Sequence, residues 1–150
     1  MLKAGDNAPE FDAPSSRGGN LKLSSLRGKR VVLFFYPKAF TTGCTIEARS
    51  FRDNYESLVA QGVEVVGVSM DPLDRQCDFA NAEQLKYPLV ADPDGKITAA
   101  FGVRWPILKA AKRVTFVIDE KGVISAAFRH ELQIGKHLDD VRKHLGVAQH

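Results

Sequence analysis

Five short apolar stretches divide the chain and predict the strands of a β-sheet. Residues 29–37 (KRVVLFFYP) and 63–69 (VEVVGVS) are continuous apolar runs, which is typical of strands buried on both faces. Residues 87–92 predict a shorter strand of the same kind. Residues 113–119 and 122–128 flank a turn that contains glycine, and they predict an antiparallel hairpin.

Segments with helical periodicity lie between these runs. From residue 43 onward the apolar side chains recur at helical spacing, which predicts one helix that ends at Gly62. Asp71 is expected to cap a second helix, with Pro72 at its first position. A last helix is expected to end before Gly146. Its apolar face is formed by Ile134, Leu138, Val141 and Leu145.

This alternation of strands and helices predicts an α/β layer fold, with a central mixed sheet flanked by helices. The 150 residues fit a single domain (1–150), because no repeat, low-complexity tract or linker divides them. The net charge of +3 is spread over both signs, so neither nucleic acid nor a membrane surface is expected as a partner. The chain has no signal-peptide-like start, no apolar window of membrane-spanning length and only 2 cysteines, which indicates a cytoplasmic protein.

One of the two cysteines, Cys44, lies where the first apolar run gives way to a helix. Ligands of α/β sheets bind outside the carboxyl ends of the strands. The first turn of a helix also presents backbone N–H groups that favour a thiolate. Position alone leaves two interpretations open, a reactive thiol or a small buried side chain.

The residues around Cys44 favour the reactive thiol. The segment YPKAFTTGCTIEARSFRD resembles the active-site segment of peroxiredoxins, whose pattern of Pro, Thr and Cys is met by Pro37, Thr41 and Cys44. The wider motifs FFYPK, VVGVS and R-x-TF-x-ID resemble the Q-type branch, the bacterioferritin-comigratory proteins. The resemblance runs from about residue 5 to residue 145. It implies a thioredoxin-like fold and a thiol peroxidase that needs no cofactor and no metal.

The resemblance also implies roles for individual residues. Cys44 would be the peroxidatic cysteine that attacks the O–O bond, and Thr41 would orient the peroxide. Pro37 would shield the thiolate, and Arg113 would stabilise both the thiolate and the departing oxygen. Glu47 matches the acid that anchors the arginine, although an acid in the first turns of a helix is also favourable without any such role.

The second cysteine, Cys77, is the candidate resolving cysteine. Q-type members carry this cysteine at one of two positions, which are Arg49 and Ala80 in the present chain. Cys77 lies three residues before Ala80 and is expected on a similar helix face. Because it shares a stripe with Leu73 and Ala80, a plain core cysteine is the alternative. The protein would then be a one-cysteine peroxiredoxin that is reduced by an external thiol.

Two further features carry weaker expectations. The four histidines lie in the C-terminal part of the chain, and we expect His137 and His144 on an exposed helix face rather than at a metal site. Residues 105–108 (WPIL) form an apolar island before Arg113. This island is expected to pack over the core, to flank the active site or to form a dimer contact.

The sequence therefore predicts an enzyme whose substrate is a hydroperoxide and whose reductant is thioredoxin or a similar thiol. We expect a monomer or a weak homodimer. A thioredoxin-like disulfide oxidoreductase would need Cys-x-x-Cys, but Glu47 stands at the second cysteine position. A non-catalytic redox sensor or holdase with the same fold remains a rival, although it would not need Thr41 and Arg113 together.

Overall fold

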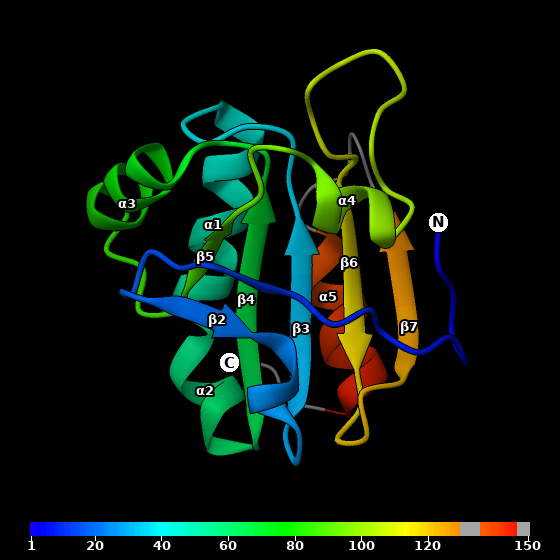
Figure 1. The fold of residues 1–150 in the computed structure, drawn as a ribbon. Helices are drawn as coiled ribbons and strands as arrows, with labels where there is room; N and C mark the ends of the chain where they lie inside the picture. Colours follow the sequence, from blue (N-terminus) through cyan, green and yellow to red (C-terminus); the bar gives the residue numbers. More distant parts are fainter. Residues whose placement is uncertain (130–135, 147–150) are drawn as a thin grey trace.

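In the computed structural model, which describes residues 1–129 and 136–146, a five-stranded mixed sheet forms the centre of the molecule (Figure 1). Its strands follow one another in the order β5 (Leu89–Ala91), β4 (Val63–Ser69), β3 (Arg30–Phe35), β6 (Val114–Ile118) and β7 (Ile124–Arg129). The strands β3, β4 and β5 are parallel, whereas β6 runs antiparallel to both β3 and β7. The predicted strands and hairpin are therefore present, and the expected mixed sheet is confirmed.

Helices cover both faces of this sheet. The elements outside the sheet are β1 (Asp12–Pro14), β2 (Asn20–Lys22), η1 (Leu23–Leu26), α1 (Thr42–Asp53), α2 (Tyr55–Ala60), α3 (Leu73–Ala82), α4 (Lys96–Ala100) and α5 (Lys136–Leu145). Figure 1 shows α1, α2 and α5 behind the sheet, with the β1–β2 ribbon and α4 in front of it. Helix α3 lies at the edge formed by β5.

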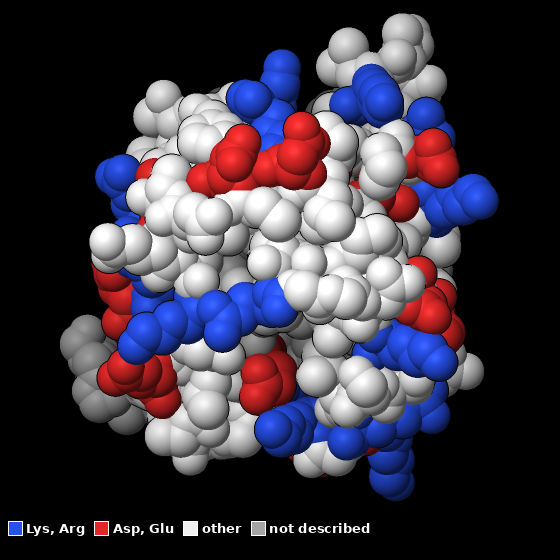
Figure 2. Space-filling view, turned by 60° about the vertical axis from the view of Figure 1, so that its left-hand side comes forward, with Lys and Arg blue, Asp and Glu red and all other residues white. Residues whose placement is uncertain are grey.

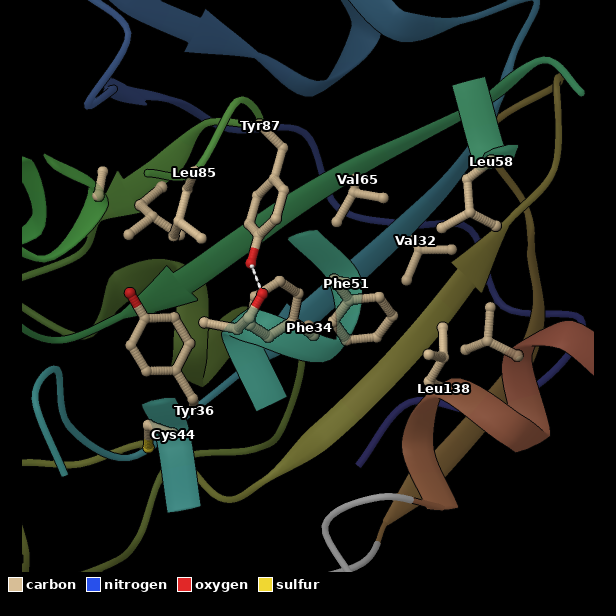
Figure 3. Close-up of a cluster of buried hydrophobic side chains, with 14 of the residues drawn as sticks. Val32, Phe34, Tyr36, Cys44, Phe51, Leu58, Val65, Leu85, Tyr87 and Leu138 are labelled. Atoms are coloured by element: carbon tan, nitrogen blue, oxygen red, sulfur yellow. Dashed lines mark hydrogen bonds between the residues drawn. The ribbon is translucent and has the colours of Figure 1, made fainter. Parts of the chain in front are cut away.

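The alternation of side chains along β3 divides the core into two layers. Val32 and Phe34 face the layer that contains α1 and α5, whereas Val31, Leu33 and Phe35 belong to the opposite layer. Figure 3 shows the first layer, with Cys44 at one end and Leu138 at the other. Both faces of the strand are buried, as its continuous apolar run predicts.

The predicted helix before Gly62 is wrong in one respect, because it is broken at Asn54. Helix α1 ends at Asp53, and α2 begins at Tyr55. The Asn54 side chain donates to the carbonyl of Ser50 at 2.8 Å, and the Asn54 backbone N–H turns to the carbonyl of Phe51 at 3.3 Å. The side-chain amide thus binds the Ser50 carbonyl, which would otherwise accept the helical hydrogen bond from the Asn54 backbone N–H.

The predicted cap at Asp71 is also wrong. Helix α3 begins at Leu73, Pro72 occupies the capping position, and no side chain caps this helix end. The carboxylate of Asp71 accepts instead from the hydroxyl of Ser69 at 2.6 Å and from the backbone N–H of Ala39 at 2.8 Å. Asp71 thus stabilises the loop after β3, and it contacts α3 through an ion pair with Arg75 at 3.6 Å rather than through a cap.

The last helix, α5, packs as the periodicity predicts where the structure describes it. Leu138 and Val141 are buried, and Gly146 adopts a left-handed conformation with φ of 69° just past the helix. Glycine favours this conformation because it lacks a Cβ atom. Ile134, expected on the same face, lies outside the described residues.

The surface matches the diffuse charge of the sequence. Figure 2, turned to bring the side of α3 and β5 forward, shows basic and acidic side chains interspersed rather than gathered into one patch. Among residues 1–129 and 136–146, no helix is long and apolar enough to cross a membrane.

Candidate active site

The candidate site forms where β3 ends and β6 begins. These antiparallel neighbours pair Phe35 with Val114, so Arg113 lies directly beside the turn that leaves β3. Sheet pairing therefore brings Arg113 close to Cys44, although 69 residues separate them in sequence. The pairing of β3 with β6 therefore sets the distance between the helix start after β3 and the residue before β6.

The loop between β3 and α1 has a fixed shape. Its Ala39 N–H is held by Asp71, and Phe40 has a positive φ of 67°. A non-glycine residue in this conformation costs about 1–2 kcal/mol. Contacts offset this cost, because the Phe40 ring lies 5.2 Å from the ring of Phe79 and 4.9 Å from the guanidinium of Arg75. The bend at Phe40 lies in the short segment that leads from the end of β3 at Phe35 to the start of α1 at Thr42.

Cys44 lies in the first turn of α1 and is only 1% exposed. The first hydrogen bond of the helix runs from Thr45 N–H to the carbonyl of Thr41 at 2.9 Å, so the N–H groups of the three residues before Thr45 precede the helical ladder. The positive end of the helix dipole therefore faces the sulfur. One guanidinium nitrogen of Arg113, Nη2, donates to Cys44 Sγ at 3.4 Å.

Glu47 binds the other terminal nitrogen of this guanidinium, Nη1. Nη1 of Arg113 donates to Glu47 Oε1 at 2.8 Å, and both residues are buried. Burial acts to lower the pKa of Arg113, but the charges of Glu47 and Cys44 and their hydrogen bonds outweigh it, so this pKa is raised above its ordinary value. The arginine remains a cation beside the sulfur. Glu47 follows Cys44 by three residues and so lies on the same face of α1.

Thr41 and Pro37 belong to the segment that leads from the end of β3 into α1. Thr41 is exposed, and its hydroxyl donates to the Lys38 carbonyl at 2.7 Å, which leaves the oxygen able to accept another hydrogen bond. Pro37 is half-buried and lines a surface hollow together with Lys38, Arg75 and other residues. The structure thus brings the sulfur and the cation into contact, and it places Thr41 three residues before Cys44 at the start of α1.

Cys77 lies on α3, away from this charged network. The buried face of α3 consists of Gln76, Phe79 and Ala80, while Cys77 is half-buried beside it and Leu73 is 37% exposed. Of the expected stripe through Leu73, Cys77 and Ala80, only Ala80 therefore lies on the core face of the helix. Both cysteines are free thiols in this structure.

His137 is the clearest correction to the expectations for the C-terminal part. It is fully buried rather than exposed, and its Nδ1 lies 2.8 Å from the hydroxyl of Thr115 and 3.7 Å from Glu47 Oε2. His144 is exposed as expected, whereas His130 and His150 lie outside the described residues. In the described part of the chain, no group of three His, Cys, Asp or Glu side chains could hold a metal ion.

The apolar island before Arg113 does not cover the core. Ile107 is 96% exposed and Leu108 is 62% exposed, so these side chains point into solvent. Trp105 is half-buried, with Lys112 Nζ at 5.3 Å and the guanidinium of Arg129 at 5.6 Å from its ring. These are cation–π distances. The exposure of Ile107 and Leu108 thus excludes the expectation that these two side chains pack over the core.

A buried thiol next to a guanidinium, at a strand-to-helix turn of a thioredoxin-like sheet, defines a thiol-dependent redox enzyme. The model of the AhpC/TSA family matches residues 4–127. The chain is 37% identical to peroxiredoxin Bcp of Escherichia coli over 147 residues, which cover 93% of each chain. The chain belongs to the AhpC/TSA family, and its activity is that of a thiol peroxidase.

Solved structures give the same result for the fold. Peroxidoxin BcpB of Mycobacterium tuberculosis superposes with a TM-score of 0.92, at 36% identity and over 100% of both chains. The bacterioferritin comigratory protein of Xanthomonas campestris, studied for its alkyl peroxide reduction activity, gives a TM-score of 0.83 at 27% identity and covers 91% of this chain and 90% of its own. These matches confirm the thioredoxin-like fold and the resemblance to the Q-type branch.

Proposed function

We propose that the chain acts as a single-domain peroxidase that reduces hydrogen peroxide and organic hydroperoxides at Cys44. The observation that carries this proposal is the guanidinium of Arg113, which lies 3.4 Å from the Cys44 sulfur while Glu47 holds its other arm at 2.8 Å. A cation fixed in this position favours the thiolate over the thiol. It is also aimed at the region where charge moves during the reaction.

The proposed chemical step is an attack of the Cys44 thiolate on one oxygen of the peroxide. An S–O bond forms as the O–O bond breaks, the departing oxygen takes up a proton, and it leaves as water or as an alcohol. Cys44 becomes a sulfenic acid. Negative charge moves from the sulfur to the departing oxygen, so a donor such as Arg113 can stabilise both ends of the reaction.

Thr41 and Pro37 are assigned to substrate approach. Because the Thr41 proton is directed to the Lys38 carbonyl, its oxygen can accept a hydrogen bond from the peroxide hydroxyl. Pro37, which is half-buried in the loop before Cys44, is assigned to shield the thiolate from solvent. Since Cys44 is only 1% exposed, a narrow terminal peroxide group reaches the sulfur more readily than a bulky one.

Cys77 is assigned to the resolving step. Its thiol attacks the sulfenic sulfur, an S–S bond forms, and water leaves. Three observations support this role: Cys77 is the only other cysteine, it is half-buried, and Phe79 of the same helix contacts Phe40 in the loop before Cys44. A disulfide needs Cα atoms within about 7 Å, so a longer separation requires the first turns of α1 and α3 to unwind. The alternative is direct reduction of the sulfenic acid by an external thiol.

The remaining assignments concern partners and location. A thioredoxin-like dithiol would reduce the disulfide through a mixed disulfide, and the enzyme would work in the cytoplasm. The exposed Ile107 and Leu108 offer only a small apolar contact, which fits a monomer or a weak homodimer better than an obligate one. A redox sensor or holdase would have no use for Arg113 and Thr41 placed around the thiol, so we favour the peroxidase.

A steady-state assay of peroxide consumption, with and without thioredoxin and its reductase, tests this proposal. We expect consumption that depends on Cys44 and accelerates when thioredoxin is present. Equal consumption by wild type and Cys44→Ser would contradict the assignment of the nucleophile. Turnover with a small thiol but not with thioredoxin would instead support the one-cysteine alternative.

A further inference from the structure

His137 is a buried polar side chain that the proposed mechanism has not used. It lies near the start of α5 and is 0% exposed, although histidine is more often only partly buried. Buried polar groups are nearly always hydrogen-bonded, and the partners of this one lead toward the active site. Its Nδ1 lies 2.8 Å from Thr115 Oγ1 on β6.

The position of Thr115 connects His137 to the site. Thr115 follows Arg113 by two residues, so both side chains project from the same face of the sheet. Glu47 of α1 lies on this face as well, with Oε1 bonded to Arg113 at 2.8 Å. The other carboxylate oxygen, Oε2, lies 3.7 Å from His137 Nδ1. Contacts therefore run without a break from Thr115 through His137, Glu47 and Arg113 to the Cys44 sulfur.

We propose that His137, oriented by Thr115, is a positioning residue that sets the orientation of the Glu47 carboxylate and, through it, of the Arg113 guanidinium against Cys44. This inference rests on the proposed reaction at Cys44 and deepens it. It gives α5 a role in the reaction, because a side chain of this last helix helps to orient the Glu47 carboxylate on α1.

The physical reason lies in the freedom of a glutamate side chain. The terminal torsion of glutamate has a broad energy minimum, so contact at one oxygen alone leaves the carboxylate plane loosely defined. A second contact at Oε2 restricts the rotation of the carboxylate about this torsion. The planar fork of arginine transmits the orientation, since rotation of the carboxylate that binds Nη1 also moves Nη2. At 3.7 Å the contact between His137 Nδ1 and Glu47 Oε2 is longer than a hydrogen bond, so it restricts the carboxylate through packing rather than through a directed bond.

The test compares His137→Phe with His137→Asn. Phenylalanine keeps the ring but removes both nitrogens, whereas the amide of asparagine places a polar atom near the position of Nδ1. His144→Phe is the matched control, since His144 lies on the same helix but is exposed. Two quantities are measured: the second-order rate of Cys44 oxidation by hydrogen peroxide, and the pH midpoint of thiolate absorbance at the cysteine.

We expect His137→Phe to slow oxidation about tenfold and to raise the pH midpoint, because small misplacements at a reacting centre lower rates by one to two orders of magnitude. His137→Asn should recover part of the rate, and His144→Phe should leave both quantities unchanged. A rate within about twofold of wild type and an unchanged midpoint in His137→Phe would overturn the inference and leave His137 as core packing.

Two further variants keep the inference falsifiable if His137→Phe folds poorly. Thr115→Val removes the hydroxyl that orients the ring and should slow oxidation in the same direction. In a Glu47→Gln background, His137→Phe should have little additional effect, because its influence passes through the carboxylate. An equal loss in both backgrounds would overturn the inference. Measurable peroxide oxidation of wild-type Cys44 would in either case leave the proposed function standing.

Discussion

The two cysteines of the chain occupy opposite environments. Cys44 is 1% exposed, in the first turn of α1, and receives a hydrogen bond from the guanidinium of Arg113. Cys77 is half-buried in the middle of α3, beside the buried face of that helix. Within residues 1–129 and 136–146, no group donates a hydrogen bond to its sulfur. The more deeply buried thiol is thus the one that is placed among charges.

This difference shows that burial and reactivity are separate properties of a thiol. A cysteine in apolar surroundings behaves as a small hydrophobic side chain. A cysteine buried against a fixed cation and a helix N-terminus is instead stabilised as a nucleophile. Cys77 lacks that arrangement, so its assigned role is the slower attack on a sulfenic acid that Cys44 has already formed.

Replacement of the nucleophile should have the largest effect. In Cys44→Ser we expect peroxide turnover to be abolished while the fold persists, because serine is nearly isosteric but a far weaker nucleophile at neutral pH. Peroxide consumption and circular dichroism together check this expectation. Substantial residual activity in a folded variant would place the reaction elsewhere.

Loss of the cation should have the next largest effect. In Arg113→Ala we expect Cys44 oxidation to slow by about a hundredfold or more, because one donor to the thiolate and the transition state is removed. The rate of alkylation of Cys44 as a function of pH should also shift toward higher pH. Arg104→Ala, which removes an exposed arginine, is the control and should behave as wild type. An unchanged rate and an unchanged profile in Arg113→Ala would place Arg113 outside the site.

Replacement of the second cysteine should separate the two steps. In Cys77→Ser we expect the first oxidation of Cys44 to be unchanged, while thioredoxin-coupled turnover falls sharply and Cys44 over-oxidises at high peroxide. Wild type treated with one equivalent of peroxide should lose the mass of two hydrogens, as an intramolecular disulfide forms. Trp105 fluorescence should report the accompanying rearrangement. A stable sulfenic acid in wild type, and normal turnover of Cys77→Ser with a small thiol, would contradict this role for Cys77.

The smallest expected effect concerns Tyr36, which connects the end of β3 near Cys44 with helix α3, which carries Cys77. Tyr36 is buried next to the start of the active-site loop, and its hydroxyl donates to Gln76 of α3. Burial raises the pKa of Tyr36 well above its ordinary value of 10.0. Its stabilising contribution is therefore complete below pH 10 and is lost as the pH rises further, by up to about 1.4 kcal/mol per pH unit.

Urea unfolding between pH 8 and strongly alkaline pH measures this loss for wild type and for Tyr36→Phe. We expect the free energy of unfolding to fall less steeply with pH in the variant, because phenylalanine has no proton to lose. Tyr87, which is also buried and has a raised pKa, is unchanged in both proteins and serves as an internal reference. Identical slopes would show that Tyr36 does not contribute.

Long apolar runs allowed most of the sheet to be predicted from the sequence. Strand β4 has the bounds that its apolar run predicts, because a strand buried on both faces leaves a continuous signal. Breaks and caps were harder to predict, because they depend on competition between side chain and backbone. The Asn54 amide interrupts a helix whose apolar spacing continues past it. Asp71 looked like a cap, but its partner, the Ala39 N–H, lies 32 residues away in sequence.

The candidate site could be predicted in part for a similar reason. The motif around Cys44 is local and carries its own signal, whereas the burial of His137 depends on Thr115 and Glu47 from two other elements. A signal for it did exist, because His137 and Val141 are four residues apart and share the helix face that packs inward. The signal was missed because we placed His137 beside the apolar stripe of Leu138 and Val141 rather than within it.

The most direct test of the central claim is to map which cysteine a peroxide oxidises first. Wild type is mixed with less than one equivalent of hydrogen peroxide in the presence of a sulfenic acid trap, quenched at short times and analysed by peptide mass. The arrangement of Arg113 and Glu47 around Cys44 predicts trapped sulfenic acid on the peptide of Cys44, and a strong reduction of that product in Arg113→Ala. First oxidation at Cys77, or equal trapping at Cys44 with and without Arg113, would contradict the account.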